Sequence, residues 1–367
     1  MGLEREGWHV IWANDIDEDK MRMYRAHYAD DQAHFLLGDV HTIDHNRIPS
    51  VDLATASFPC NDLSLAGARR GLAGQQSGAF WGFVDAIKGM GFRQPPLILL
   101  ENVAGFLTSH DGNDFRDACL ALNELGYAVD AFLIDAANFV PQSRQRLFLL
   151  GKKEGQKAET VAEPLSFYEC ECRPHALADF IFWNPDIRWA LRELPSIRKK
   201  RVSLPAILDD LPPSSTCWWS KQRAEYLLNQ MSEKHSRIAD DMIKGKDISY
   251  GTVFRRVRHG RSMAELRTDG IAGCLRTPRG GSGRQILFKA GKGKYSVRLL
   301  TPRECARLMG ADNFTITGSL NQSLFGFGDA VCVPVIQWIA ENYLNPVWNE
   351  LYASETSQEK YKKRATG

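Results

Sequence analysis

The sequence lacks the features that would place a protein in a membrane or outside the cell. None of its apolar runs approaches the ~18–20 residues that a membrane-spanning helix needs. The N-terminus carries no signal-peptide pattern. Eight cysteines are spread over 367 residues without regular spacing, which indicates reduced thiols instead of a disulfide framework. These absences favour a cytoplasmic protein with no membrane partner.

Internal repeats and a convincing metal-ligand spacing are missing as well. The segment Cys170-Glu171-Cys172-Arg173-Pro174-His175 contains ligand types, but their spacing is tight and no fourth ligand is evident. A structural zinc ion takes four ligands, so ordinary thiols are the favoured interpretation. We therefore predict no metal site.

Charge is unevenly distributed along the chain. The net charge is only +2 because 46 basic and 44 acidic residues nearly cancel. Between positions 251 and 298, however, only Glu265 and Asp269 oppose a concentration of basic residues. Such an excess is the footprint of a polyanionic partner, although a solvated basic face has the same composition. The twelve basic residues are Arg255, Arg256, Arg258, Arg261, Arg267, Arg276, Arg279, Arg284, Lys289, Lys292, Lys294 and Arg298.

The first 151 residues alternate strand-like and helix-like segments. Apolar runs at residues 10–13, 51–57, 97–100, 131–134 and 147–150 predict strands, and residues 18–29, 77–90 and 112–125 predict helices. This alternation predicts an α/β fold with a doubly wound, mostly parallel sheet. Residues 152–296 are irregular and predict a smaller second domain. Residues 297–350 return to the first domain, and residues 351–367 form a charged tail.

A thiol occupies a favourable place at the end of one predicted strand. The segment Ser57-Phe58-Pro59-Cys60-Asn61-Asp62 follows the apolar run 51–56, and its proline fixes the backbone directly before Cys60. Open α/β sheets bind ligands beyond the carboxyl ends of their strands. Cys60 is therefore the candidate nucleophile.

Other short motifs occur in order around Cys60. Glu101-Asn102-Val103 follows the strand at 97–100, and Gln142-Ser143-Arg144-Gln145-Arg146 precedes the strand at 147–150. A helix at 300–310 and then Gly328-Asp329-Ala330-Val331 complete the series. One such motif is weak, whereas the ordered set resembles the DNA cytosine-5 methyltransferases of bacterial restriction–modification systems. The resemblance runs from Gly2 to about residue 343, except in the middle region.

The resemblance implies a reaction and its residues. Cys60 would add to C6 of a flipped-out cytosine, after which C5 accepts a methyl group from S-adenosylmethionine. Glu101 would protonate or hydrogen-bond the ring at N3. Arg144 would hold the cytosine O2 and orient Glu101, while Arg146 would support the same pocket or the nearby backbone. The residues Ser64 and 67–78 resemble the mobile loop that closes over the base.

The resemblance also implies a cofactor pocket. Asp15, after the second strand of the family fold, would bind ribose hydroxyls, and Ile16 would lie against the adenine. Asp39, followed by Val40, would accept from the adenine amino group. The remaining expected pocket residues are Phe58, Pro59, Gly328, Asp329 and Ala330.

One part of the family pattern is absent. Members begin with a central strand and a Phe-x-Gly-x-Gly-Gly loop, but here only the following helix end, Gly2-Leu3-Glu4-Arg5-Glu6-Gly7, is matched. We expect the chain to be truncated within this first cofactor motif. Met1 is then either an internal methionine of a longer protein or the start of a truncated, inactive remnant. Sequencing the N-terminus of the native protein would distinguish the two.

The basic middle region occupies the place of the family's target-recognition domain. Arg276, Arg279 and Arg284 surround a glycine cluster and are candidates for reading DNA, with Ser64 and Gln142 as further contacts. The expected partners are duplex DNA and a cognate restriction endonuclease, and the expected state is a monomer. Two alternatives stay open, which are a non-catalytic DNA-binding remnant and a tRNA cytosine-5 methyltransferase. The sequence does not reveal the recognition site.

Overall fold

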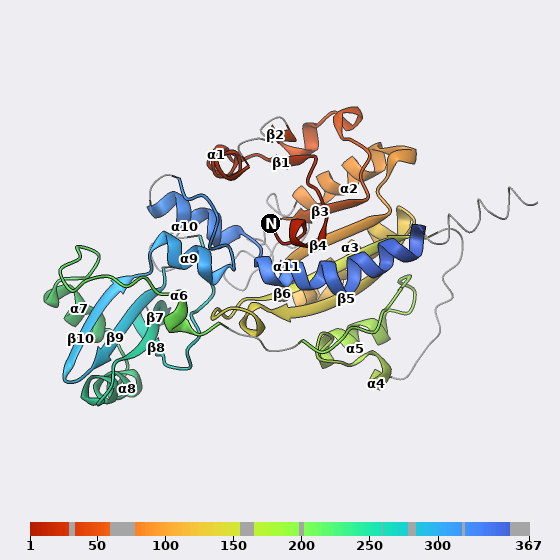
Figure 1. The fold of residues 1–367 in the computed structure, drawn as a ribbon. Coiled ribbons are helices and arrows are strands. Elements are labelled where there is room, and N and C mark those ends of the chain that lie inside the picture. Colours follow the sequence, from red (N-terminus) through yellow and green to blue (C-terminus); the bar gives the residue numbers. More distant parts are fainter. Residues whose placement is uncertain are drawn as a thin grey trace, which may run out of the picture.

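The protein consists of a larger α/β domain and a smaller β-rich domain, which lie side by side (Figure 1). The computed structural model describes residues 1–28, 34–58, 78–154, 165–197, 202–258, 260–277, 284–317 and 320–352. The predicted site residues Pro59, Cys60, Ser64 and Arg279 lie outside these described residues.

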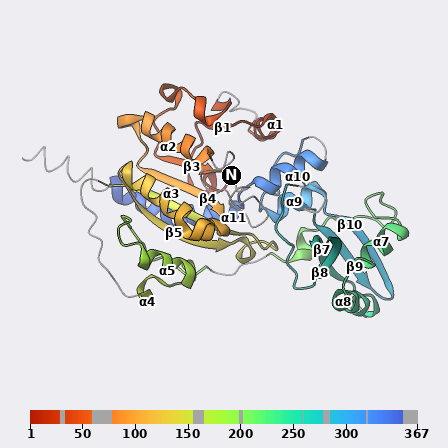
Figure 2. The same ribbon diagram turned by 180° about the vertical axis from the view of Figure 1, so that it is seen from behind.

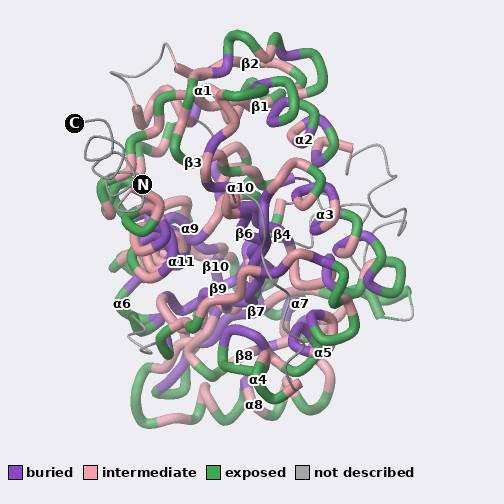
Figure 3. Tube along the Cα trace, turned by 90° about the vertical axis from the view of Figure 1, so that its right-hand side faces the viewer, coloured by how far each residue is buried: buried purple, intermediate pink, exposed green. Residues whose placement is uncertain are grey.

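The larger domain is built on a four-stranded sheet with the order β3-β4-β6-β5. Strands β3 (Leu53–Ser57) and β4 (Leu97–Val103) are parallel, whereas β6 (Gln145–Lys153) runs antiparallel to both β4 and β5 (Tyr127–Asp135). Residues 97–100 are all buried because both faces of the sheet are covered. Figure 3 shows this buried core running through β4 and β6.

Helices cover the two faces of this sheet, as the predicted doubly wound fold requires. Helices α2 (Ala79–Gly89) and α3 (Asn113–Glu124) pack on the face that presents Ile98 and Leu100. Helix α11 (Val333–Ile339) and the π-helical turn Ala340–Leu344 pack on the other face, against Leu97 and Leu99. Figures 1 and 2 show α11 and α3 on opposite sides of the strands. The three predicted helices and the α/β class are confirmed.

A separate two-stranded sheet holds β1 (Ala13–Asp15) and β2 (Phe35–Leu37) in parallel, with α1 (Glu18–His27) beside it. The predicted strand at 10–13 begins only at Ala13, because residues 9–12 join no ladder among the described residues. No described strand connects β1 to β3.

The boundary predicted after residue 151 lies too early. Helix α5 (His175–Trp183), preceded by α4 (Leu165–Tyr168), packs Leu177 and Ile181 onto the main sheet. Trp189 forms a parallel bridge with Val129 of β5. This segment belongs to the larger domain, because its apolar face completes the core over α3 and β5.

The smaller domain is more regular than predicted. Its antiparallel sheet has the order β10-β9-β7-β8, formed by β10 (Lys294–Leu299), β9 (Ile286–Gly291), β7 (Ser249–Arg258) and β8 (Arg261–Arg267). Helices α7 (Lys221–Leu228) and α8 (Glu233–Lys244) pack on it, and α6 (Leu204–Ile207) precedes them. Arginines in the exposed half of β7 interrupt its hydrophobic pattern, so the sequence did not predict this strand.

Helices α9 (Pro302–Leu308) and α10 (Leu320–Asp329) connect the domains (Figure 1). Thr301 and Glu304 form a capping box at the start of α9, and the helix predicted at 300–310 is confirmed over Pro302–Leu308. By length and composition the stretch Asn321–Tyr352 would pass as a membrane span. Half of its most apolar window is buried inside the structure, as in a core helix. Short 3-10 helices occur at Glu4–Glu6, Val40–Thr42, His45–Arg47, Gly91–Arg93, Ala104–Gly112 and Ala136–Asn138.

Candidate active site

The ends of β4 and β6 bring a carboxylate and a guanidinium together. The antiparallel register places Val103 opposite Arg146, and Arg146 Nε lies 2.8 Å from Glu101 Oε1. Glu101 is 8% exposed and Arg146 also donates to the Gln145 carbonyl at 2.9 Å. The guanidinium is thus held from two sides, and it fixes the orientation of the Glu101 carboxyl group.

The expectation that Arg144 orients Glu101 is wrong, because Arg144 is turned into the protein. Its guanidinium donates to the carbonyls of Leu275 at 3.0 Å, Gly328 at 3.1 Å and Ala330 at 2.6 Å. Burial, followed by the charge of Arg146, lowers the pKa of Arg144. Arg146 therefore takes the place at the carboxylate that was predicted for Arg144. Arg144 instead forms a structural clamp, in which it binds three backbone carbonyls.

Gln142 is likewise not placed to contact DNA, because its side chain is fully buried. Its Nε2 donates to the Leu308 carbonyl at 2.8 Å, and its Oε1 accepts from Leu275 N at 2.9 Å. The backbone beside it forms a bridge with Ala272. Gln142 thus anchors residues 271–277, which we call the docking segment, to the larger domain.

The end of β3 lies next to Glu101. Ser57, at the end of β3, is the register partner of Glu101. Phe58 follows, and its carbonyl accepts from Asn102 Nδ2 at 3.4 Å. The place of Phe58 in the cofactor pocket stays a prediction. Its ring packs in the core between Phe80 and Phe106, with centroid distances of 5.3 Å and 5.5 Å.

Two acidic side chains lie at the carboxyl ends of β1 and β2. Asn14 Nδ2 donates to the carbonyls of Leu36 and Gly38, both at 2.9 Å, and so ties the two strand ends together. Asp15 and Asp39 follow at these ends. Each carboxylate also accepts from a backbone N–H two residues on, at 2.9 Å from Asp17 and 3.0 Å from His41.

The neighbouring apolar candidates behave differently. Ile16 is 69% exposed, which is unusual for a large aliphatic side chain without a function. Val40 is half-buried and packs against the α2 side of the core, close to Gly82. Ile16 therefore offers an open apolar surface, whereas Val40 mainly supports the loop.

Lys20, which sequence reasoning missed, links two of the predicted cofactor residues. Its Nζ lies 3.7 Å from Asp15 Oδ2 and 3.2 Å from Asp329 Oδ2. Burial opposes protonation, but these carboxylates raise the pKa of Lys20 overall. No local pattern identified this residue, because Asp329 comes from α10 at the other end of the chain.

The last turn of α10 also meets the docking segment. A Cβ added to Gly328 would lie 2.5 Å from the Arg276 carbonyl carbon and 2.5 Å from Thr277 N, so only glycine fits there. Arg276 is exposed beside this turn. Arg284 instead donates to Asn321 Oδ1 at 2.5 Å and is tied to α10. Of the DNA-reading candidates in the described residues, Arg276 is the one that faces solvent.

Comparison with known proteins identifies this arrangement. The family described as C-5 cytosine-specific DNA methylase matches residues 1–345. Type II methyltransferase M.Bsp6I from Bacillus sp. (strain RFL6) is 24% identical over 347 residues, covering 93% of each chain. The DNA-cytosine methyltransferase of Escherichia coli (strain K12) is 28% identical, over 93% of this chain and 74% of that protein.

Solved structures show the same fold at low sequence identity. The Dnmt2 methyltransferase of S. pombe superposes with a TM-score of 0.60 at 16% identity, over 94% of both chains. The methyltransferase EhMeth of Entamoeba histolytica gives 0.60 at 15% identity, over 95% of this chain and 93% of that one. At this level of identity the likeness concerns the fold alone.

Proposed function

Because this chain belongs to the C-5 cytosine-specific DNA methylase family, we propose that it methylates C5 of cytosine within one specific duplex DNA sequence, with S-adenosylmethionine as the methyl donor. The enzyme class follows from the family match over residues 1–345. The observation that supports the proposed mechanism is the Glu101–Arg146 pair beside the end of β3.

The proposed mechanism uses Cys60 as nucleophile and Glu101 as the acid, with Arg146 as the residue that positions Glu101. The Cys60 thiolate adds to C6 of a cytosine that has left the duplex, and electron density moves toward C5. Glu101 holds a proton at ring N3, and Arg146 keeps its carboxyl group in the required orientation. After C5 gains the methyl group, its proton leaves to a base and the Cys60 sulfur is eliminated, which restores the aromatic ring and the free enzyme.

The described residues fit the proposed cofactor. S-adenosylmethionine, when bound, supplies an electrophilic methyl group on a sulfonium centre. Asp15 and Asp39 offer carboxylates to hydroxyl and amino donors, Ile16 offers an exposed apolar surface to adenine, and Asp329 completes the acidic surroundings. These assignments agree with the ends of β1 and β2 being tied together through Asn14.

The smaller domain supports a DNA target. Many of its basic residues lie on an antiparallel sheet, and the docking segment between β8 and β9 contacts Gln142 and Arg144 of the larger domain. The curated relatives named as type II methyltransferases support a cytoplasmic modification enzyme that is paired with a restriction endonuclease.

Bisulfite sequencing of plasmid DNA from cells that express the 367-residue chain tests the proposal. Cys60→Ala serves as the control. We expect methylation at one recurring short sequence with the parent chain and none with the variant. An unmethylated plasmid together with a methylated tRNA acceptor in a parallel transfer assay would favour the tRNA enzyme. Duplex binding without transfer to either acceptor would favour the non-catalytic remnant.

A further inference from the structure

A two-stranded ribbon extends beyond the sheet of the smaller domain. Strand β9 pairs with β7 only from Ser249↔Ala290 to Val253↔Ile286. The pairing of β7 with β8 continues from Phe254↔Glu265 to Arg258↔Arg261. Among the described residues, β9 does not reach this basic ribbon (residues 254–258 and 261–265), whose one further ladder contact is a bridge between Met231 and Ala264. An antiparallel ribbon of this kind fits the major groove of B-DNA.

The basic ribbon carries a strong positive charge with a single carboxylate. Arg255, Arg256 and Arg258 come from β7, Arg261 comes from β8, and Glu265 is the one acidic residue among them. Alternation along the strands places Arg256 and Arg258 on the same face as Glu265. The ribbon therefore attracts a polyanion while keeping one acceptor next to two arginines.

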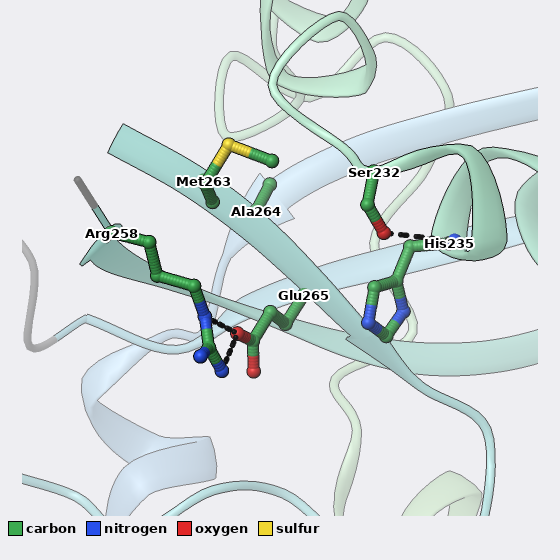
Figure 4. Close-up of a pocket in the computed structure, with 6 residues that line it drawn as sticks. All are labelled: Ser232, His235, Arg258, Met263, Ala264 and Glu265. Atoms are coloured by element: carbon green, nitrogen blue, oxygen red, sulfur yellow. Dashed lines mark hydrogen bonds and ion pairs between the residues drawn. The ribbon is translucent and has the colours of Figure 1, made fainter. Parts of the chain in front are cut away.

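Glu265 holds Arg258 in a defined orientation, as Figure 4 shows. Its Oε1 accepts from Arg258 Nε at 2.9 Å and from Nη2 at 2.8 Å. The second oxygen lies 4.0 Å from Arg256 Nε. The Glu265 side chain is 17% exposed, whereas the Arg258 side chain is 56% exposed. The carboxylate is thus sheltered and the guanidinium that it holds faces outward.

Neighbouring residues also hold the Glu265 side of this ion pair in place. Glu265 lies in a pocket with Met263, Ala264, Ser232 and His235 (Figure 4). The neighbouring Leu266 N donates to His235 Nδ1 at 3.2 Å, which ties β8 to α8. The position of the Glu265 carboxylate is therefore set by the sheet and by α8, and not by the ribbon tip alone.

A guanidinium held in this way presents a defined set of donors. Of its five N–H groups, two point to Glu265, and the three at the outer end remain available. Guanine displays two acceptors, O6 and N7, in the major groove, and the arginine fork matches them. Resting on the function proposed above, we propose that Arg258, oriented by Glu265, reads a guanine in the DNA target.

Charge distinguishes this role from a phosphate contact. Pairing with Glu265 cancels the net charge of Arg258, which weakens its long-range attraction to phosphate. The same pairing leaves the directional donors in place, and these are what a base edge recognises. A residue that only held the backbone would gain from losing Glu265, whereas a base-reading residue would lose its orientation.

Selection of bound duplexes from a library with a randomised centre tests the inference without requiring methyl transfer. The full chain is compared with Arg258→Ala, Arg258→Lys and Glu265→Gln. Glu233→Gln is the matched control, because Glu233 is an exposed carboxylate of α8 that pairs with Arg237 and not with an arginine of the ribbon. We expect Arg258→Ala to lose roughly 5- to 150-fold discrimination at one guanine and little elsewhere. Lysine should fail to restore it, because it lacks the fork.

A second measurement uses duplexes with 7-deazaguanine at the selected position, which removes the N7 acceptor. The parent chain should bind this duplex more weakly, while Arg258→Ala should no longer distinguish it from guanine. Glu265→Gln should relax the same position, and Glu233→Gln should not. A uniform loss across all sequences, tighter binding by Glu265→Gln without loss of preference, or no sequence preference in the parent chain would overturn the inference. Sequence-selective binding without bisulfite-detected methylation would instead count against the proposed function alone.

Discussion

Arg146 Nε lies 2.8 Å from Glu101 Oε1, across the antiparallel pair of β4 and β6. The contact comes from the strand register, which places a cation beside the carboxylate near the carboxyl ends of β3 and β4. Arg144, only two residues earlier, instead clamps three backbone carbonyls. The two arginines should therefore give different phenotypes.

Arg146→Ala should lower the rate of methyl transfer with little effect on folding or on duplex binding. Without its guanidinium the Glu101 carboxyl group loses its fixed orientation, and a misplaced acid costs about a hundredfold. Single-turnover transfer to a cognate duplex measures the rate, and Glu101→Gln provides the reference for full loss of the proton donor. An unchanged single-turnover rate would remove Arg146 from the mechanism.

Arg144→Ala should mainly destabilise the protein. It leaves the carbonyls of Leu275, Gly328 and Ala330 without their donor, and each unsatisfied buried group costs about 1–3 kcal/mol. We expect the free energy of unfolding in urea to fall by about 3 kcal/mol in total, because the losses are not additive. Arg146→Ala is the matched control and should lose less than half of this amount. Equal losses in the two variants would contradict the clamp.

Lys20→Met should make the cofactor site favour cations. Lys20 now neutralises Asp15 and Asp329, so its removal raises the negative potential there. The dissociation constant of S-adenosylhomocysteine divided by that of the sulfonium-bearing S-adenosylmethionine should rise by up to about fivefold, as expected for partly exposed charges. Calorimetric titration gives both constants, and Lys20→Arg should leave the ratio unchanged. A ratio in Lys20→Met equal to that of the parent chain would place the cofactor elsewhere.

Acid should destabilise the protein partly through His27. Burial, and then the N-terminal amino group, lower the pKa of His27, and Thr315 N donates to its Nδ1 at 3.2 Å. A histidine with a depressed folded pKa contributes stability above its unfolded pKa of about 6.5, and loses it as the pH falls toward the folded pKa. The midpoint temperature of thermal unfolding should therefore fall more for the parent chain than for His27→Gln as the pH is lowered from about 7 to about 5. Parallel pH profiles for the two proteins would exclude this contribution.

Local sequence was sufficient for the main elements and for one member of the catalytic pair. The apolar run before Glu101 predicts a buried strand with a carboxylate at its end, because burial on both faces gives a continuous hydrophobic segment. Pro302 likewise favours a helix start, because its fixed backbone angle suits the first helical position and needs no distant partner. The sheet of the smaller domain was missed, because the second half of β7 carries Arg255, Arg256 and Arg258 and so lacks the apolar pattern of a buried strand.

Only the tertiary structure decided which side chains meet. Arg144 and Arg146 look equivalent in the sequence, and the register Val103↔Arg146 assigns one of them to Glu101. The carbonyls that bind Arg144, the partners of Gln142 and the second carboxylate of Lys20 all come from distant parts of the chain. Hydrogen bonds and ion pairs act over a few ångströms in space, whatever the separation along the sequence. The motifs therefore predict the chemistry, and the packing of the chain determines which residue performs it.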